Sequence, residues 1–169
     1  MKTPTDEQLF AAWVDATVEA EAPPPAARAR LLATLEGPRR FALVARALGR
    51  VTHLGADAVT AVLTKIDDAT TWIDAPFPGV RYFNFTPGAT AGAVEAGLVR
   101  LRPGARFPHH RHLGHEVSLV LDGLLEERGQ VHGPGSIVKA ERGTAHDYAA
   151  GPGRDLLLVS VHGGFEILP

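Results

Sequence analysis

The chain of 169 residues contains no cysteine. This absence excludes disulfide bonds, catalysis by a thiol and any zinc site that is built on thiolates. An excess of one charge is also lacking, since 17 basic and 19 acidic side chains give a net charge of -2. A balanced charge of this kind argues against direct nucleic-acid binding, because no basic excess is present to neutralise phosphates.

Long apolar runs are lacking as well, and no stretch of the sequence has the length and hydropathy of a bilayer span. The first residues, Met-Lys-Thr-Pro-Thr-Asp-Glu, lack the apolar core of a signal peptide. We therefore expect a cytoplasmic protein that does not insert into a membrane. Hydrophobic residues make up 45% of the chain, which is enough for a folded core.

Residues 1–73 have the pattern of a small helical region. Apolar residues recur at helical spacing in four segments between residues 5 and 69, and Pro23–Pro25, Gly37 and Gly49 separate these segments. The last two apolar stripes are Phe41, Val44, Ala45 and Leu48, and then Ala58, Val59, Val62, Leu63 and Ile66, with Asp57 as the expected N-cap. We interpret these stripes as surfaces for helix packing.

Residues 74–169 have a different sequence pattern, which is typical of strands. Short alternating segments are interrupted by Gly or Pro, which is typical of an antiparallel sandwich or barrel. The segment Asp74–Gly79 reads as a linker or turn. The expected strands are Val80–Phe85, Ala93–Arg102, Phe107–Arg111, Glu116–Leu121, Leu124–Arg128, Gly135–Ala140, Ala145–Ala149 and Leu156–His162.

A cluster of metal-ligating residue types lies between Gly104 and Gly123. His110 and His112 are two residues apart, and Glu116 has the same parity, so strand geometry places their side chains on one face. His146 opens a later strand that a barrel would bring beside them. Three imidazoles and one carboxylate suit Zn²⁺, Fe²⁺, Mn²⁺, Ni²⁺ or Cu²⁺, and these ligand types do not select among the metals.

The other residues near this cluster carry weaker signals. His109, His115 and His132 are expected on the surface or at turns, whereas His162, Ser118 and Tyr148 are candidates for the pocket. If Glu116 and Ser118 face the metal, Val117, Leu119 and Leu121 face away from it. That apolar face must be covered by the opposite sheet, by the N-terminal helices or by a second subunit.

Two spaced motifs resemble those of the cupin superfamily, which are the β-strand signatures of a jelly-roll barrel. The first is Gly104, five residues, His110-x-His112, three residues, Glu116, six residues and Gly123. The second is Gly135, five residues and then Glu141-Arg-Gly-Thr-Ala-His146, in which Glu141 replaces a frequent proline. The resemblance implies a mainly β cupin barrel that is preceded by a small helical region, with His110, His112, Glu116 and His146 as metal ligands.

Within the cupins, the sequence is most similar to the C-terminal domain of ChrR-type anti-sigma factors. The residues that carry this resemblance lie between 76 and 165 and include Arg102-Pro-Gly-Ala-Arg-Phe-Pro, Val120-Leu-Asp-Gly, Gly133-Pro-Gly-Ser136 and Gly143-x-x-His146. The resemblance implies a zinc-binding cupin that senses oxidants and a helical region that binds a sigma factor. However, the family's N-terminal zinc motif needs cysteine, and its zinc-dependent module therefore cannot be carried over to this chain.

Three functions remain open at this stage. The first is a regulatory or sensory cupin that regulates transcription through a sigma factor or another regulatory protein, detects an oxidant or a small-molecule ligand, and forms a homodimer. The second is a metal-dependent dioxygenase that acts on a diketone-like substrate, with Arg100, Arg102 and Arg106 flanking the site. The third is a structural cupin whose metal only braces the barrel.

Overall fold

The computed structural model describes residues 24, 26–27, 30 and 37–169. The chain divides into two compact units, residues 1–35 and 36–169. In the first unit, Ala26, Ala27 and Arg30 are helical. The first helix that the sequence predicts lies outside the described residues, and so do the leucines that form the apolar stripe of the second, Leu31, Leu32 and Leu35. All of the elements that follow belong to the second unit. None of the described helices is long and apolar enough to cross a membrane.

Helical elements occupy the start of the second unit. They are the 3₁₀ helix η1 (Gly37–Phe41), the helices α3 (Ala42–Thr52) and α4 (Ala56–Thr64), and the short 3₁₀ turns η2 (Lys65–Asp67) and η3 (Ala69–Thr71). The two predicted apolar stripes are confirmed, because Val44 and Leu48 of α3 and Val59, Val62 and Leu63 of α4 are buried. Asp57 is not the N-cap, since Gly55 holds that position and Asp57 lies in the first turn.

The rest of the chain is built from strands. They are β1 (Ile73–Asp74), β2 (Val80–Phe85), β3 (Glu95–Leu101), β4 (Arg106–His112), β5 (Glu116–Asp122), β6 (Leu125–Glu127), β7 (Gln130–His132), β8 (Ile137–Ala140), β9 (Ala145–Ala150), β10 (Leu156–His162) and β11 (Phe165–Ile167), with a further 3₁₀ turn, η4 (Ala89–Ala91). Every strand that the sequence predicts has a counterpart, and three short strands, β1, β7 and β11, were not expected. The expected linker Asp74–Gly79 is the turn of the β1–β2 hairpin.

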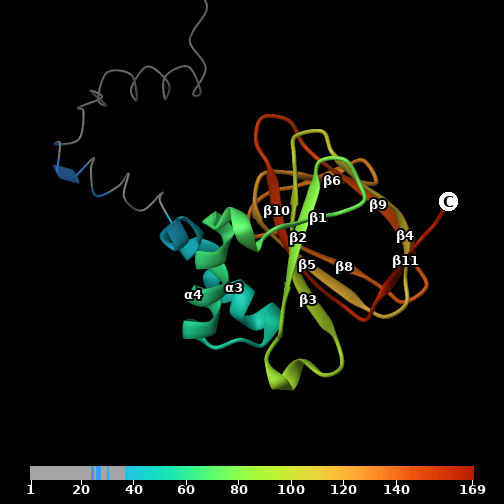
Figure 1. Cartoon of the computed structure of the whole chain (residues 1–169), viewed down its shortest axis with the longest axis horizontal. Helices are drawn as coiled ribbons and strands as arrows, with labels where there is room; N and C mark the ends of the chain where they lie inside the picture. Colours follow the sequence, from blue (N-terminus) through green and yellow to red (C-terminus); the bar gives the residue numbers. More distant parts are fainter. Residues whose placement is uncertain (1–23, 25, 28–29, 31–36) are drawn as a thin grey trace, which may run out of the picture. The chain divides into compact units, whose positions relative to one another are not determined.

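These strands form two antiparallel sheets, and the predicted jelly-roll fold is confirmed. A six-stranded sheet has the order β1-β2-β3-β10-β5-β8, and a five-stranded sheet has the order β11-β4-β9-β6-β7. The strands lie beside one another with α3 and α4 on one side of them (Figure 1). Because β4 pairs with β9, the two histidine-bearing strands of the sequence are neighbours in the five-stranded sheet.

Two hydrophobic cores lie on opposite faces of the six-stranded sheet. One fills the space between the sheets and includes Leu101, Val120 and Leu158. The other joins the outer face of the sheet to the helices, and in it Leu119 and Leu121 pack with residues such as Leu48. The prediction that this face of β5 is covered is therefore confirmed, and the N-terminal helices are what covers it.

An ion pair links the two ends of the helical segment. Arg40 donates hydrogen bonds to both carboxylate oxygens of Asp67, at 2.8 and 2.7 Å. The hydrogen bond from Arg40 is the largest cause that lowers the pKa of Asp67 below its ordinary value of 3.8. The Asp67 side chain is half exposed, so solvent screening limits the contribution of the pair to about 0.5 kcal/mol.

The pH dependence of this pair can be predicted from the direction of the pKa shift. The lowered pKa of Asp67 means that the stabilisation is complete above about pH 4 and is lost as the pH falls through the folded-state value. We expect Arg40→Gln to lower the free energy of unfolding by about 0.5 kcal/mol at pH 6 and by less at pH 3, measured by urea denaturation. In an Asp67→Asn background the same substitution should have a pH-independent effect, and a persistent pH dependence there would contradict the assignment.

Candidate metal centre

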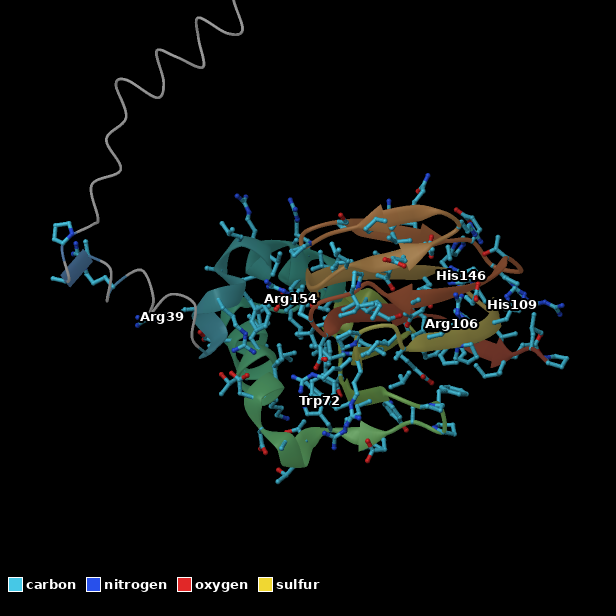
Figure 2. All side chains as sticks on the ribbon, turned by 90° about the horizontal axis from the view of Figure 1, so that it is seen from above. Arg39, Trp72, Arg106, His109, His146 and Arg154 are labelled. Atoms are coloured by element: carbon cyan, nitrogen blue, oxygen red, sulfur yellow. The ribbon has the colours of Figure 1, made fainter. Side chains whose placement is uncertain are left out.

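Three buried histidines meet at the paired strands β4 and β9. His110 and His112 alternate along β4 and point to the same side, and His146 of β9 is the register partner of His110. One ring nitrogen from each histidine lies within 4.8 Å of the others, an arrangement that can hold a metal ion. His146 lies on the side of the barrel that is remote from the helices (Figure 2).

Each of the three imidazoles is held through its Nδ1 atom. His110 Nδ1 donates to the carbonyl oxygen of Pro108 at 2.9 Å, and His112 Nδ1 donates to the carbonyl oxygen of Thr144 at 3.0 Å. His146 Nδ1 lies 2.7 Å from Oε2 of Glu127. Because these partners accept hydrogen bonds, they fix the proton on Nδ1 and leave Nε2 with a free lone pair, which is the state that ligates metals.

The Nε2 atoms of His112 and His146 are buried and have no hydrogen-bond partner among the described residues. A buried polar atom without a partner costs free energy, so such atoms require an explanation in a folded protein. Two such atoms, pointing into one imidazole cluster from rings fixed at the other nitrogen, fit a metal ion, whose coordination would satisfy both of them. The residues of the cluster therefore suit the divalent metal that the sequence suggests.

Glu116 approaches this cluster from β5 of the other sheet. Its Oε2 atom lies 3.6 Å from Nε2 of His112, and Ser118 donates a hydrogen bond to Oε1 at 2.9 Å. Glu116 is thus buried and oriented, although it is not part of the three-histidine group that meets the 4.8 Å spacing. The carboxylate therefore lies beside the histidine cluster, where the sequence places the fourth candidate ligand.

Burial favours the neutral form of one imidazole of the site, that of His110. The pKa of His110 is lowered below its ordinary value, mainly because burial disfavours the imidazolium, while the Pro108 hydrogen bond opposes this effect. His110 is therefore neutral near pH 7 and competent to ligate a metal. Burial also raises the pKa of the Tyr148 phenol well above its usual range, with the carboxylates of Glu116 and Glu127 contributing in the same direction.

A cavity of about 290 Å³ opens onto the centre from within the barrel. His110 and Glu116 form part of its wall, and Tyr148 and His162, which the sequence suggested as pocket residues, also line it. Ser118 instead faces a much smaller neighbouring space and orients Glu116. The centre is therefore accessible to a small molecule on the side of His110 and Glu116.

The remaining histidines and the flanking arginines lie elsewhere. His109 and His115 are exposed, as expected, and His132 is half buried in β7. The three arginines that flank the sequence motif do not line the cavity: the Arg100 guanidinium stacks 4.3 Å from the centre of the Trp72 ring, Arg102 is exposed, and Arg106 pairs with Asp147. Trp72 and Arg106 are labelled in Figure 2.

Glu127, the carboxylate that holds His146, is a residue of the site that the sequence did not reveal. Glu127 is almost completely buried, and its hydrogen bond with His146 is the largest cause that lowers the pKa of this carboxyl. Glu127 lies on β6, which is paired with β9, so only the strand pairing brings it to His146. The sequence carries no signal that separates Glu127 from the exposed acidic residue beside it, Glu126.

Removing Glu127 is expected to weaken metal binding without removing a ligand. A carboxylate that accepts the Nδ1 proton orients the ring and raises the basicity of Nε2, and its loss typically costs about 10–100-fold in metal affinity. We expect a decrease of that size for Glu127→Ala and a smaller one for Glu127→Gln, measured by competition with a chromophoric chelator. The exposed neighbour Glu126 provides the matched control, Glu126→Ala. Equal affinities for the wild type and Glu127→Ala would contradict this role.

The double-sheet barrel and its buried histidine cluster define a cupin of the kind that can hold a metal ion. The family model described as the ChrR Cupin-like domain matches residues 60–166, and the chain belongs to this family. The resemblance that the sequence motifs indicated is therefore confirmed. The match also begins inside α4, so it includes part of the helical segment that packs on the barrel.

Solved structures share the fold at low sequence identity. The crystal structure of Rhodobacter sphaeroides SigE in complex with the anti-sigma ChrR aligns with a TM-score of 0.56 and 20% identity, and it covers 92% of this chain and 75% of that chain. An acetylacetone dioxygenase from Acinetobacter johnsonii aligns with a TM-score of 0.51 and 15% identity, over 60% of this chain and 74% of that one. Comparison with curated proteins gives no match.

Proposed function

We propose that this protein is a metal-binding regulatory cupin whose metal is held by His110, His112, His146 and Glu116. The observation that carries the proposal is the pair of buried, unpartnered Nε2 atoms in rings that are fixed through Nδ1. Zinc is the proposed metal because the resemblance to the ChrR-type cupins implies it, and three imidazoles and one carboxylate are ligands that zinc accepts. Fe²⁺, Mn²⁺ and Ni²⁺ are alternatives that metal analysis of the untagged protein would distinguish.

The proposed regulatory partner is a sigma factor or another regulatory protein that binds through the helical region 1–73, with the cupin barrel, 74–169, acting as the sensor. Two observations support this role. The ChrR protein with the same fold is an anti-sigma factor in complex with SigE. In addition, α3 packs against β5 and β10. Glu116 therefore lies on one face of β5, and the opposite face of the same strand contacts the helices. Metal or ligand binding at Glu116 thus has a short route to the helical surface.

Capture experiments test the regulatory role. The full chain, either loaded with zinc or treated with EDTA, is mixed with extracytoplasmic-function sigma factors encoded in the same genome. We expect one sigma factor to be captured, with an affinity that differs between the two metal states or changes after oxidant treatment. The proposal is contradicted if no sigma factor or other regulatory protein is captured in either state. Size-exclusion chromatography of the same samples tests the expected homodimer.

A dioxygenase activity is the second candidate, and the cavity favours it. The cavity reaches the metal centre beside His110 and Glu116, and a bound metal supplies Lewis-acid or oxygen-activating chemistry there. The acetylacetone dioxygenase with the same fold suggests diketones as substrates. Oxygen consumption by the Fe(II)-loaded protein over a panel of diketones and catechols tests this activity. A complete lack of turnover would leave the regulatory function or a purely structural metal, and stability that depends on an added ligand would favour the regulatory function.

A further inference from the structure

The wall of the cavity opposite β4 and β9 is formed by β10 and its neighbours. Ser160 and His162 both line the cavity, and they are the register partners of Ser118 and Glu116 on β5. Paired residues on adjacent antiparallel strands have Cα atoms roughly 4.5–5.5 Å apart. Ser160 and His162 therefore lie one strand away from the carboxylate at the metal centre, in a position to contact a molecule that reaches the metal.

The hydroxyl of Ser160 has no hydrogen-bond partner among the described residues, although the residue is only 8% exposed. Such a hydroxyl is costly to bury unless something else satisfies it. The residues paired with Ser160 on the adjacent strands do not satisfy this hydroxyl. Ser118 on β5 donates its hydrogen bond to Glu116. Gly97 on β3 has no side chain. The hydroxyl is thus an unused donor and acceptor within the cavity.

His162 adds a second polar group with a defined hydrogen-bonding role. The backbone N–H of Gly164 donates to Nδ1 of His162 at 3.1 Å, so Nδ1 is an acceptor and the ring proton lies on Nε2. The ring is also fixed by an edge contact with Phe165, at 5.2 Å between centroids. The cavity wall therefore carries one N–H donor and one hydroxyl on the same strand.

The charge of the wall limits what can bind. Among the described residues that line the cavity, none is lysine or arginine, whereas two carboxylates, Glu95 and Glu116, are present. The rest of the lining is largely apolar and includes the rings of Phe77, Phe107 and Phe165. A phosphate or a polycarboxylate would find no cation there except the metal itself, and its remaining charges would face carboxylates.

We propose that the cavity binds one small, mainly apolar ligand that is neutral or singly charged, and that Ser160 and His162 form its polar subsite. This inference rests on the proposed metal centre. The ligand coordinates the metal through oxygen at the His110 and Glu116 end, and a second polar group roughly one strand spacing away bonds to Ser160 and His162. A volume of about 290 Å³ suits a molecule built on a single ring.

The test uses the full chain loaded with Co²⁺ and three probes, namely benzohydroxamic acid and its 3-hydroxy and 3-carboxy derivatives. The visible spectrum of Co²⁺ reports whether each probe ligates the metal, and calorimetry gives its affinity. We expect the 3-hydroxy probe to bind about 3–10-fold more tightly than the parent, which is the value of one hydrogen bond. The 3-carboxy probe should bind more weakly than the parent, because the wall repels it.

Ser160→Ala should abolish the preference for the 3-hydroxy probe without reducing Co²⁺ content or thermal stability. Ser136, which does not line the cavity, provides the matched control, Ser136→Ala. If Co²⁺ binds but the preference is equal in the wild type and Ser160→Ala, the subsite is refuted and Ser160 holds only water. If Co²⁺ does not bind at all, the proposed metal centre is refuted. The subsite is then refuted too, because it rests on that centre. Tighter binding of the 3-carboxy probe would overturn the inferred ligand class.

Discussion

Replacing His112 with alanine is expected to yield a protein that purifies without its metal and that no longer responds to EDTA. His112 is completely buried, and its unpartnered Nε2 atom lies 3.6 Å from Oε2 of Glu116, so the substitution would remove one of the proposed ligands. Removing a ligand should cost more than the roughly 10–100-fold loss of affinity that follows from changing an outer-shell partner. Metal analysis by mass spectrometry, after purification without an affinity tag, measures the outcome directly.

The same substitution has an expected effect on stability. A ligand that binds only the folded state, at a free concentration of 100 times its Kd, contributes about 2.7 kcal/mol. For a domain of this size that corresponds to a decrease of roughly 5–10 °C in Tm when the metal is removed. EDTA should therefore lower the Tm of the wild type by this amount and leave the Tm of His112→Ala unchanged.

His109 supplies the matched control for this prediction. It lies on the same strand with the opposite parity, and it is exposed. His109→Ala should retain the metal content of the wild type and its response to EDTA. An equal loss of metal in both variants would show that the histidine-rich strand binds metal nonspecifically, and full occupancy in His112→Ala would remove His112 from the ligand set.

The histidine cluster was predictable from the sequence because two simple rules apply to it. Side chains alternate along a strand, so the spacing of His110 and His112 placed them on one face, and the spacing of the motifs suggested that His146 would join them. The same alternation predicted that Leu119 and Leu121 face away from the site. Alternation is local geometry, which a sequence carries directly, whereas the place of His146 followed from the resemblance to the cupin motifs.

What the sequence did not reveal depends on pairing between distant strands. Glu127 lies on β6 and Ser160 on β10, and a single sequence does not show that β6 pairs with β9 or that β10 pairs with β5. Neither residue carries a motif of its own. The short strands β1, β7 and β11 were also missed, because two or three residues are too few to show a periodicity. The order of the strands in the sheets is therefore what the structure adds to the site.

Replacing Leu119 with alanine tests the other face of the strand that bears Glu116. Leu119 is fully buried in the core between the six-stranded sheet and the helices α3 and α4. Truncating a buried leucine removes apolar contacts and leaves a cavity, which typically costs about 2–5 kcal/mol. We expect a loss of that size in the free energy of unfolding, measured by urea denaturation, with metal affinity close to that of the wild type because the side chain points away from the histidines.

Leu43 provides the control, since it is 98% exposed on α3 and Leu43→Ala should change stability by less than about 0.5 kcal/mol. Hydrogen exchange distinguishes two ways in which Leu119→Ala can act. If the helices and the barrel unfold together, protection falls equally in α3 and in the strands. If α3 loses protection while the barrel keeps it, the helices can detach from the sheet separately, which is the two-state behaviour that a regulatory role requires. An unchanged stability would contradict the packing of the helices on β5.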